Sequence, residues 1–519
     1  MKRSKVVLVN PRMCRPHSVR LPLSVLALGA ALEEIYDYEI IDGNLDMDAR
    51  ASILTSLQED PVLVAFTVMP GPQIAPAIDL ASAVRSARPD IPIVWGGYFP
   101  TLYPDAAINA PYVDYVVRGQ GEETFLDLLA RLPDCGSPLA SDSPDSSSAT
   151  SPEPLRTVAG LTWKDRGEII HNPDRKLRGP QGAGPYPYHR LRNLDAYLRP
   201  SFMGTRTAVH QASVGCRYHC TFCGVVSMFN GFTSPEPAQH LNQALDTLKN
   251  RYFANALQFY DHNFFDSERA AIPVLDVLAS AEMPWWCYAR ADTLARFSRN
   301  TWALLRKSRL TMAYIGAEAG SDEVLKRMRK GSRVEHTLEV ARLCKEYGII
   351  PEFSFVLGGP EDPEGEIEKT LEFIRRIKRI NAGCEVILYF YSPTPQRDRA
   401  VRNPASSAPL LPVLNSYGPN GPDLPSTPEE WTQPQWINYV CHQDAPWLSP
   451  RIRQRVKDFA KVLSCRFPTV QDYSTPRWGK SLLRGLASWR YSTRSYGKPW
   501  ELDLARKYIP IREPQRDSL

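Results

Sequence analysis

The chain has 519 residues, of which 43% are hydrophobic and 23% charged, and its formal net charge is +5. This length allows about three domains that each bury a core, and the ordinary composition excludes a fibrous or fully disordered chain. So small a net charge over this length gives no indication of nucleic-acid binding. The ten cysteines are scattered except for one central trio, which fits a reducing cytoplasm rather than a disulfide framework. The basic start and five apolar residues of segment 1–10 form no signal peptide, and the longest apolar run, residues 21–32, is too short to cross a bilayer.

Residues 1–132 predict a first domain built from five βα repeats, because short apolar runs alternate with segments of helical periodicity. Such repeats favour a doubly wound, flavodoxin-like parallel sheet that binds ligands beyond the C-terminal ends of its strands. The predicted strands are residues 5–9, 38–41, 62–68, 91–95 and 112–117, and the predicted helices are residues 23–35, 46–57, 73–88, 104–109 and 122–132.

The ends of these strands are rich in glycine and polar residues. Any single glycine there could simply allow a tight turn between strand and helix, but five such ends in one domain favour a ligand pocket. The stretch 94–129 (VWGGYFPTLYPDAAINAPYVDYVVRGQGEETFLDLL), together with the Asn10-Pro11 opening and the Gly71-Pro72-Gln73 turn, resembles the cobalamin-binding domain that precedes many radical S-adenosylmethionine (SAM) domains. The resemblance implies cobalamin contacts from Asn10, Thr67, Gly71, Gln73, Gly96, Gly97, Tyr98, Gly119, Gly121 and Glu122.

This first domain departs from other cobalamin proteins in one motif. The DxHxxG motif that supplies a lower axial histidine is absent, and His17 is the only histidine before residue 171. Bound cobalamin would therefore lack a histidine ligand from this domain.

Two stretches separate the first domain from the next. Residues 133–155 are dominated by Pro, Ser and Asp, which predicts a disordered insertion without a core. Residues 156–200 read as a linker that contains a small hairpin, formed by segments 158–163 and 168–171 around a turn at 165–167.

Residues 201–395 begin a second βα series, which predicts a partial or complete βα barrel with its active site at the C-terminal strand ends. The predicted strands are residues 207–214, 256–260, 285–289, 312–316, 352–357 and 385–391, with helices that include 238–252, 321–328 and 366–380.

The cysteine trio Cys216, Cys220 and Cys223 follows the first of these strands in a CxxxCxxC run. Three thiolates this close can hold three irons of a cubane cluster and leave the fourth iron open. The alternatives are a zinc knuckle, a disulfide or a chance cluster, although no paired CxxC or HxxxH group follows that would complete a structural zinc site. The run resembles the radical SAM signature, in which an aromatic residue precedes the last cysteine as Phe222 does here.

Polar groups also follow the other strands of the predicted barrel. Alone, Asp261 could cap a helix, Arg290 could form a surface ion pair and Glu318 could be a solvated loop acid, but six such ends on one barrel face favour a site. The segments 259–265 (FYDHNFF), 315–321 (IGAEAGS), 356–361 (VLGGPE) and 389–395 (YFYSPTP) resemble radical SAM strand motifs. The resemblance implies SAM contacts from Phe222, Asp261, Arg290, Glu318, Gly358 and Gly359. In this interpretation Glu318 accepts from the ribose hydroxyls and Arg290 reaches the methionine carboxylate.

The C-terminal part consists of a Pro-rich loop, residues 396–430, and a mainly helical region, residues 431–519. Tyr391 and Trp431 are the candidate substrate contacts. The stretch 477–508 is basic and amphipathic; it can lie on a membrane surface, but packing against its own domain is the more common use of such a segment. Its resemblance to the tails of relatives that act on hydrophobic compounds implies a lipophilic or natural-product substrate.

Together these resemblances identify a class B type, cobalamin-dependent radical SAM enzyme that carries a [4Fe–4S] cluster, SAM and cobalamin. They imply reductive SAM cleavage, hydrogen abstraction from an unactivated carbon and methyl transfer to it, with an electron donor such as flavodoxin or ferredoxin. Radical ring formation or oxidation without methyl transfer is the alternative within enzymes. An iron–sulfur electron carrier or corrinoid-binding module is the alternative of another class.

Overall fold

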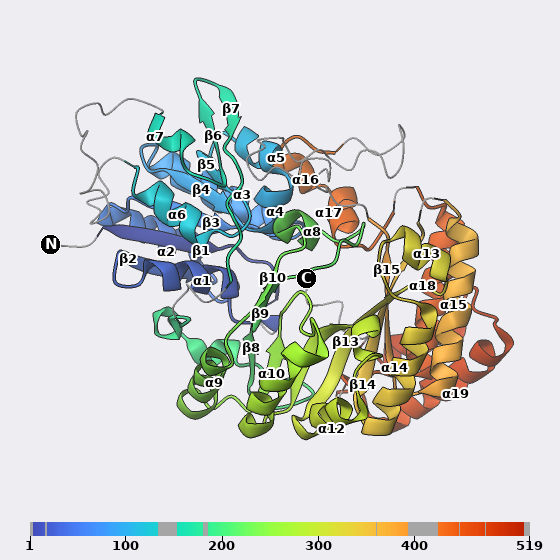
Figure 1. Ribbon diagram of the computed structural model, residues 1–519. Helices are drawn as coiled ribbons and strands as arrows, with labels where there is room; N and C mark the ends of the chain where they lie inside the picture. The colour runs from blue at the N-terminus through green and yellow to red at the C-terminus, as the bar shows by residue number, and fades with distance from the viewer. Residues whose placement is uncertain are drawn as a thin grey trace.

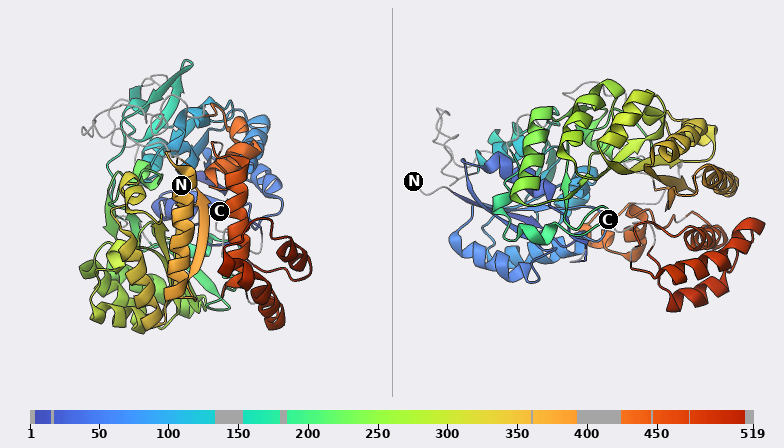
Figure 2. Two further views of the ribbon diagram at one scale, coloured as in Figure 1. Left: turned by 90° about the vertical axis from the view of Figure 1, so that its right-hand side faces the viewer. Right: turned by 90° about the horizontal axis from the view of Figure 1, so that it is seen from below.

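The computed structural model describes residues 4–15, 18–132, 153–179, 185–359, 361–392, 424–445, 447–472 and 474–512. Two parallel sheets dominate it, one in the N-terminal part and one in the central part of the chain (Figure 1). They lie side by side, and the last three helices of the chain pack along the outer edge of the second sheet (Figure 2). Most of the predicted insertion at 133–155 and of the predicted loop at 396–430 lies outside the described residues.

The N-terminal sheet has the strand order β2-β1-β3-β4-β5-β6-β7, and the first five strands are parallel. An order of 2-1-3-4-5 is that of flavodoxin-like sheets, so the predicted fold is confirmed. Apolar residues fill these strands because helices cover both faces; all five residues of β3, for example, are buried. The parallel strands are β1 (Lys5–Asn10), β2 (Asp37–Asp42), β3 (Leu63–Thr67), β4 (Ile93–Gly96) and β5 (Tyr115–Val117). The helices between and after them are α1 (Leu23–Leu32), α2 (Ala49–Ser56), α3 (Ile74–Ala87), α4 (Tyr98–Leu102), α5 (Pro104–Asn109) and α6 (Glu122–Leu129).

The predicted hairpin is part of this sheet. β6 (Leu161–Asp165) pairs antiparallel with β5, and β7 (Glu168–His171) pairs antiparallel with β6. The N-terminal domain therefore continues past residue 132. The expectation for residues 153–155 is wrong, because they begin the short helix α7 (Glu153–Arg156) instead of extending a disordered insertion.

The second sheet has six parallel strands in the order β15-β14-β13-β12-β11-β8. Its end strands β8 and β15 do not pair with each other, so the barrel is partial. The strands are β8 (Thr207–His210), β11 (Ala256–Phe259), β12 (Trp285–Arg290), β13 (Leu310–Glu318), β14 (Ile350–Leu357) and β15 (Glu385–Phe390). The helices are α8 (Val225–Phe229), α9 (Ala238–Asp246), α10 (Glu268–Ala281), α11 (Ala291–Leu294), α12 (Arg299–Lys307), α13 (Asp322–Arg327), α14 (Val334–Tyr347) and α15 (Pro363–Ile380).

The first predicted barrel strand, 207–214, divides in two. β8 ends at His210, and the following β9 (Ser213–Gly215) leaves the barrel to pair antiparallel with β10 (Thr233–Pro235). Asp261 explains the break, because its buried carboxylate accepts hydrogen bonds from Ala212 N at 3.1 Å and from Ser213 Oγ at 2.6 Å. The chain is thereby turned out of the barrel just before the cysteine loop.

The C-terminal region divides between the two sheets. α16 (Pro428–Trp431) packs on α3 of the N-terminal domain and leads into α17 (Pro434–Val440), whereas α18 (Pro450–Arg466) packs against α15 of the barrel. α19 (Arg477–Thr493) packs against α18, and α20 (Trp500–Tyr508) packs against α19. Among the described helices, none is both long and apolar enough to cross a membrane.

Two buried carboxylates lie near the N-terminal end of the barrel strands and predict a pH-dependent stability. Burial, together with the nearby Glu385, raises the pKa of Glu352 to about 8 from 4.5. The folded protein then binds this proton more tightly than the unfolded chain, so Glu352 contributes stability that is present below about pH 4.5 and is lost as the pH rises towards 8, by at most about 5 kcal/mol. We expect Glu352→Gln to flatten this decline in chemical denaturation at pH 5 and pH 8. The exposed Glu346→Gln is the control, and an unchanged decline in the Glu352 variant would contradict the assignment.

Candidate active site

The cysteine loop lies between β9 and α8, at the C-terminal edge of the barrel strands. Its backbone is held by Thr221 N, which donates to Met328 O at 3.0 Å, and by Cys223 N, which donates to Cys220 O at 3.2 Å. Desolvation and the neighbouring Cys220 raise the pKa of Cys223 to about 12, and the pKa of Cys216 is raised mainly by burial. The three thiols are thus close enough to influence one another, as ligands of one cluster must be.

The donor set fits a cluster better than a single ion. No group of three His, Cys, Asp or Glu side chains within the described ranges is arranged to hold one metal ion, which is what a zinc knuckle requires. A cubane cluster instead binds each thiolate through a different iron. Two cations, Arg290 and Lys330, lie close enough to offset part of the rise in the pKa of Cys216 that burial causes.

Arg290, at the end of β12, joins the cysteine loop to the barrel. Its Nε donates to Asp292 Oδ1 at 2.9 Å, its Nη1 donates to Cys220 Sγ at 3.6 Å, and its Nη2 donates to Lys330 O. The guanidinium also stacks on the Tyr218 ring, 3.4 Å from the centroid. All three nitrogens are therefore used within the protein. This arrangement favours a positioning role for Arg290 over the proposed contact with the methionine carboxylate.

Replacing this arginine should impair the cluster without unfolding the barrel. A lysine ammonium group cannot donate to Asp292, Cys220 and Lys330 at once, as the planar guanidinium does. We therefore expect Arg290→Lys to lower iron content and SAM cleavage about 10- to 100-fold. Arg296→Lys is the matched control, because Arg296 is 68% exposed and touches Asp292 only at 4.0 Å. Wild-type iron content in the Arg290 variant would contradict this role.

Glu318 ends β13 in the left-handed region, at φ +60, where the β13–β14 register shifts. Its Oε1 accepts a hydrogen bond from the buried Lys330 Nζ at 2.6 Å. The carboxylate folds back over Gly316, where any Cβ would meet both Glu318 Oε1 and Lys330 Nζ, which explains the glycine in this segment. No hydrogen bond to Glu318 Oε2 is recorded from the described residues, so this oxygen remains available for a ribose hydroxyl.

Most of the other predicted SAM and substrate residues lie around the mouth of the barrel, whereas Asp261 lies in its core. Phe222 packs against a small buried cluster that contains Tyr391, and Gly358 O accepts from Trp447 Nε1 at 3.0 Å, so these groups lie around the mouth of the barrel. A Cβ at Gly359 would lie 3.1 Å from Glu366 Oε2. Asp261, by contrast, is fully buried, and its carboxylate accepts the hydrogen bonds from Ala212 and Ser213 that separate β8 from β9.

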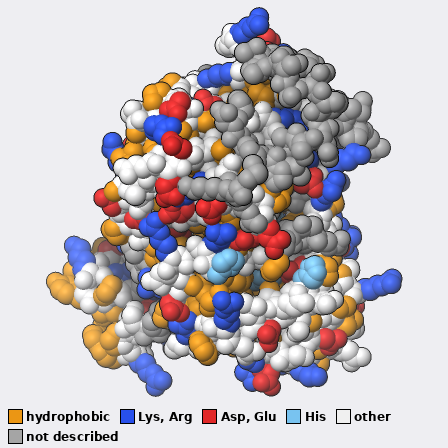
Figure 3. Space-filling model, turned by 90° about the vertical axis from the view of Figure 1, so that its left-hand side faces the viewer, with side chains coloured by type: hydrophobic (Ala, Val, Ile, Leu, Met, Phe, Trp, Pro, Cys, Tyr) orange, Lys and Arg blue, Asp and Glu red, His pale blue; other side chains and the backbone are white. Residues whose placement is uncertain are grey.

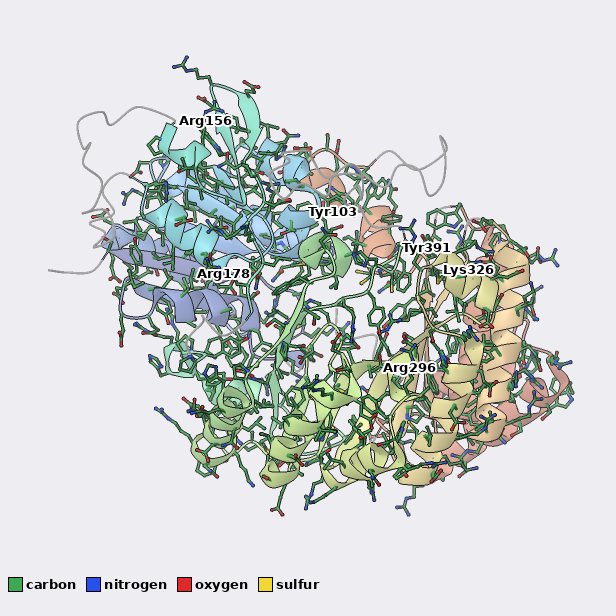
Figure 4. The ribbon with its side chains drawn as sticks, viewed as in Figure 1. Tyr103, Arg156, Arg178, Arg296, Lys326 and Tyr391 are labelled. Atoms are coloured by element: carbon green, nitrogen blue, oxygen red, sulfur yellow. The ribbon has the colours of Figure 1, made fainter. Side chains whose placement is uncertain are left out.

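Tyr391 and Trp431 occupy different environments. Figure 4 shows Tyr391 at the end of β15 and Tyr103 on the N-terminal domain, both towards the junction of the two sheets. Tyr439 of α17 lies near both, and burial together with these two rings raises its pKa. Trp431 is fully buried in the N-terminal core, with its ring centroid 4.3 Å from that of Tyr103. Its position favours a packing role over the predicted substrate contact.

The predicted cobalamin residues gather at the C-terminal edge of the N-terminal sheet, as the fold requires. The order 2-1-3 places the topological switch between β1 and β3, which end at Asn10 and Thr67. Gln73 connects the two ends, because its Nε2 donates to Asn10 Oδ1 at 2.9 Å and its Oε1 accepts from Met69 N at 2.7 Å. Thr67 Oγ1 donates to Ser24 Oγ at 3.2 Å. These hydrogen bonds fix the loops at the C-terminal ends of β1 and β3 relative to each other.

The glycines at this edge differ in what surrounds them. Gly119 has a φ of +73 and no heavy atom within 4 Å of an added Cβ, so a ligand can approach its backbone. Gly97, with a φ of +99, packs against Thr67 Oγ1 and the Val68 backbone, and Gly71 packs against Cys441 Sγ. Gly96 and Gly121 adjoin Val117. Glu122 opens α6, and burial raises its pKa. Gly119 is therefore the glycine of this set that best fits a ligand contact.

The two candidate cofactor sites meet where α4 contacts α8 (Figure 1). Tyr98, the first residue of α4, reaches across to Gly224, directly after Cys223, and a Cβ at Gly224 would collide with the Tyr98 hydroxyl. Burial raises the pKa of Tyr98, and so does the charge of Cys223. The edge of the N-terminal sheet is thus in direct contact with the cysteine loop.

This contact predicts a specific pair of variants. Gly224→Ala should displace the cysteine loop and lower SAM cleavage about tenfold, because the methyl group overlaps the Tyr98 hydroxyl. Tyr98→Phe removes that hydroxyl, so we expect the double variant Gly224→Ala/Tyr98→Phe to recover most of the activity, with Tyr98→Phe alone as the control. A double variant as impaired as Gly224→Ala would show that the two residues do not interact.

Sequence reasoning missed three members of this site: Lys330, Tyr218 and Gly224. Lys330 lies in a basic stretch after α13 that reads as a solvated surface, yet its side chain is buried.

Comparisons with known proteins agree with this arrangement. Residues 211–374 match the Radical SAM superfamily, and residues 17–129 match the B12 binding domain. The uncharacterized methyltransferase PH0819 of Pyrococcus horikoshii is 24% identical over 362 residues, which cover 69% of this chain and 73% of that protein. The anaerobic magnesium-protoporphyrin IX monomethyl ester cyclase of Cereibacter sphaeroides is 23% identical over 341 residues, which cover 64% of this chain and only 52% of the cyclase.

A solved structure shares the fold. The radical SAM methyltransferase TsrM from Kitasatospora setae, with cobalamin and a [4Fe–4S] cluster bound, matches with a TM-score of 0.58 at 18% identity, over 76% of this chain and 73% of TsrM. Radical SAM domains use a [4Fe–4S] cluster and SAM, and a B12 binding domain holds cobalamin, so these are the cofactors of this chain. The chain therefore contains a radical SAM superfamily domain, residues 211–374, preceded by a B12 binding domain, residues 17–129.

Proposed function

We propose that the protein is a methyltransferase that moves a methyl group from SAM, by way of cobalamin, to an unactivated carbon of a small lipophilic substrate. The contact between Tyr98 and Gly224 carries this proposal, because it joins the cobalamin-binding edge directly to the cysteine loop. The methyltransferase names of PH0819 and TsrM support it. When bound, the cluster with SAM supplies a radical that removes a hydrogen atom, and cobalamin supplies a transferable methyl group.

The chain's own residues would orient the reactants and exclude water. Arg290 and Lys330 hold the cysteine loop, and Glu318 presents a carboxylate oxygen to SAM. Gly119 allows close approach to the N-terminal edge. Fixing two cofactors and a carbon atom in one geometry removes the entropy cost of bringing them together, which is the protein's main contribution to the rate.

Aromatic rings below the cysteine loop support a lipophilic substrate. Tyr288 and Tyr314 lie two residues before Arg290 and Gly316, on the same face of their strands. Their ring centroids are 5.0 Å apart, and both side chains are only partly buried. Tyr389 of β15 adjoins Tyr314. A partial barrel lined in this way offers apolar surface to a substrate.

The test uses anaerobically reconstituted full-length protein with cobalamin, methyl-deuterated SAM and a reductant, either dithionite or a flavodoxin or ferredoxin system. S-adenosylhomocysteine that forms only in the presence of cobalamin, together with 5′-deoxyadenosine, is the expected result. 5′-Deoxyadenosine without S-adenosylhomocysteine would instead favour radical ring formation or oxidation, an alternative supported by the similarity to the cyclase. Neither product from a fully assembled cluster would indicate an electron carrier or a corrinoid-binding module.

A further inference from the structure

The last two helices expose a continuous set of large apolar side chains. α19 has one apolar stripe, including Leu483 and Ala487, buried against the protein, and a second stripe that faces solvent. α20 continues the exposed stripe. We call these seven side chains the apolar ridge: Trp478 (66% exposed), Leu482 (50%), Leu486 (37%), Trp489 (62%), Trp500 (68%), Leu504 (50%) and Tyr508 (80%).

The exposed side chains of the ridge form one continuous apolar surface and are not isolated exposed residues. Its α19 members recur every three or four residues and its α20 members every four, so each helix presents one apolar face. The expectation that this segment packs its apolar side on its own domain is therefore only half right, because a second apolar stripe remains uncovered. Figure 2 shows the two helices projecting from the body of the molecule. In Figure 3, hydrophobic side chains gather with Lys and Arg at the lower left, where these helices project.

The charge around the ridge is strongly positive. Residues 477–512 contain nine Lys or Arg and two acidic residues, whereas the whole chain carries only +5, so the remainder has a slight acidic excess. Both acidic residues are already paired, Glu501 with Arg490 and Asp503 with Lys461. Arg477, Arg484, Lys498 and Lys507 are exposed, and no acidic partner is recorded for them among the described residues.

We infer that the apolar ridge of α19 and α20 docks the protein on an anionic lipid surface. Trp and Tyr rings suit the boundary between headgroups and acyl chains, Leu side chains enter the acyl region, and Lys and Arg attract anionic headgroups. A second copy of this chain is a poorer occupant, since pairing two ridges would bring two strongly positive surfaces together. This inference does not depend on methyl transfer.

Vesicle flotation of the reconstituted full-length protein tests the inference. We expect it to float with vesicles of phosphatidylcholine mixed with phosphatidylglycerol, to bind phosphatidylcholine alone far less, and to dissociate as the salt concentration rises. The variant Trp478→Ser/Trp489→Ser/Trp500→Ser should bind the mixed vesicles at least about tenfold more weakly, because it removes three interfacial anchors. Arg477→Gln/Arg484→Gln/Lys507→Gln should lose the preference for anionic vesicles.

Matched controls distinguish docking through the ridge from non-specific binding to vesicles. Met47→Ser replaces an apolar side chain that is 73% exposed elsewhere, and Arg156→Gln/Arg178→Gln removes two exposed charges that Figure 4 places on the N-terminal domain; both should bind vesicles like the wild type. SAM cleavage should be unchanged in all these variants, which shows that they are folded. Equal binding by the tryptophan variant and the wild type, or no binding to mixed vesicles, would overturn the inference. So would a concentration-dependent dimer that the tryptophan variant abolishes, since a second copy would then be the occupant.

Discussion

Replacing Cys223 by alanine is expected to abolish SAM cleavage. The loop has three cysteines for three irons, so the loss of one leaves a second iron without a protein ligand. The loss of activity should be larger than the loss of about 10- to 100-fold that follows when a residue hydrogen-bonded to a metal ligand is replaced. Iron and sulfide content, the visible absorbance of the cluster and 5′-deoxyadenosine formation under anaerobic conditions measure it.

Cys14→Ala is the control for this prediction. Cys14 is half-buried like Cys223, but it belongs to the N-terminal domain, where its Sγ donates to Asn44 Oδ1 at 3.3 Å. The control should keep the iron content and the activity of the wild type. An active Cys223→Ala variant with a full complement of iron would mean that the cluster is bound elsewhere.

Replacing Glu318 by glutamine is expected to weaken SAM binding about 10- to 100-fold. A hydrogen bond to a charged acceptor contributes about 1.5–3 kcal/mol, and the amide offers the ribose a neutral oxygen instead. Equilibrium dialysis of SAM against the reconstituted protein, without substrate, measures this directly.

Structural damage must be separated from lost contact, because Glu318→Gln also leaves Lys330 as an unpaired buried cation. The double variant Glu318→Gln/Lys330→Met removes that charge and should restore the thermal midpoint, while SAM binding stays weak. If the double variant recovers SAM binding as well, Glu318 serves only to hold Lys330 in place.

Periodicity predicted the two sheets well, because nearly every strand is an apolar run bounded by glycine or polar residues. β3 and β14 are examples in which the predicted and observed bounds differ by one or two residues. The strand 207–214 was predicted as one element because its break depends on Asp261, 47 residues beyond the strand. A contact with a residue so distant in the sequence does not change the local hydrophobic periodicity.

The candidate site was predictable where chemistry lies within one segment, as in the cysteine loop. It was less predictable where partners come from distant segments. The pairs Arg290–Cys220 and Tyr98–Gly224 join residues 70 or more positions apart, so their contacts follow from the fold alone. Trp431 illustrates the same limit, because its burial depends on α16 packing across to α3.

The central claim is that this chain brings a SAM-cleaving cluster and cobalamin together in one protein. The most direct measurement quantifies 5′-deoxyadenosine and tightly bound corrinoid in one anaerobically reconstituted sample given dithionite and SAM. We predict reductant-dependent 5′-deoxyadenosine, with about one corrinoid per chain retained after gel filtration because one B12 binding domain is present. A fully assembled cluster that cleaves no SAM, or a protein that retains no corrinoid, would contradict the account.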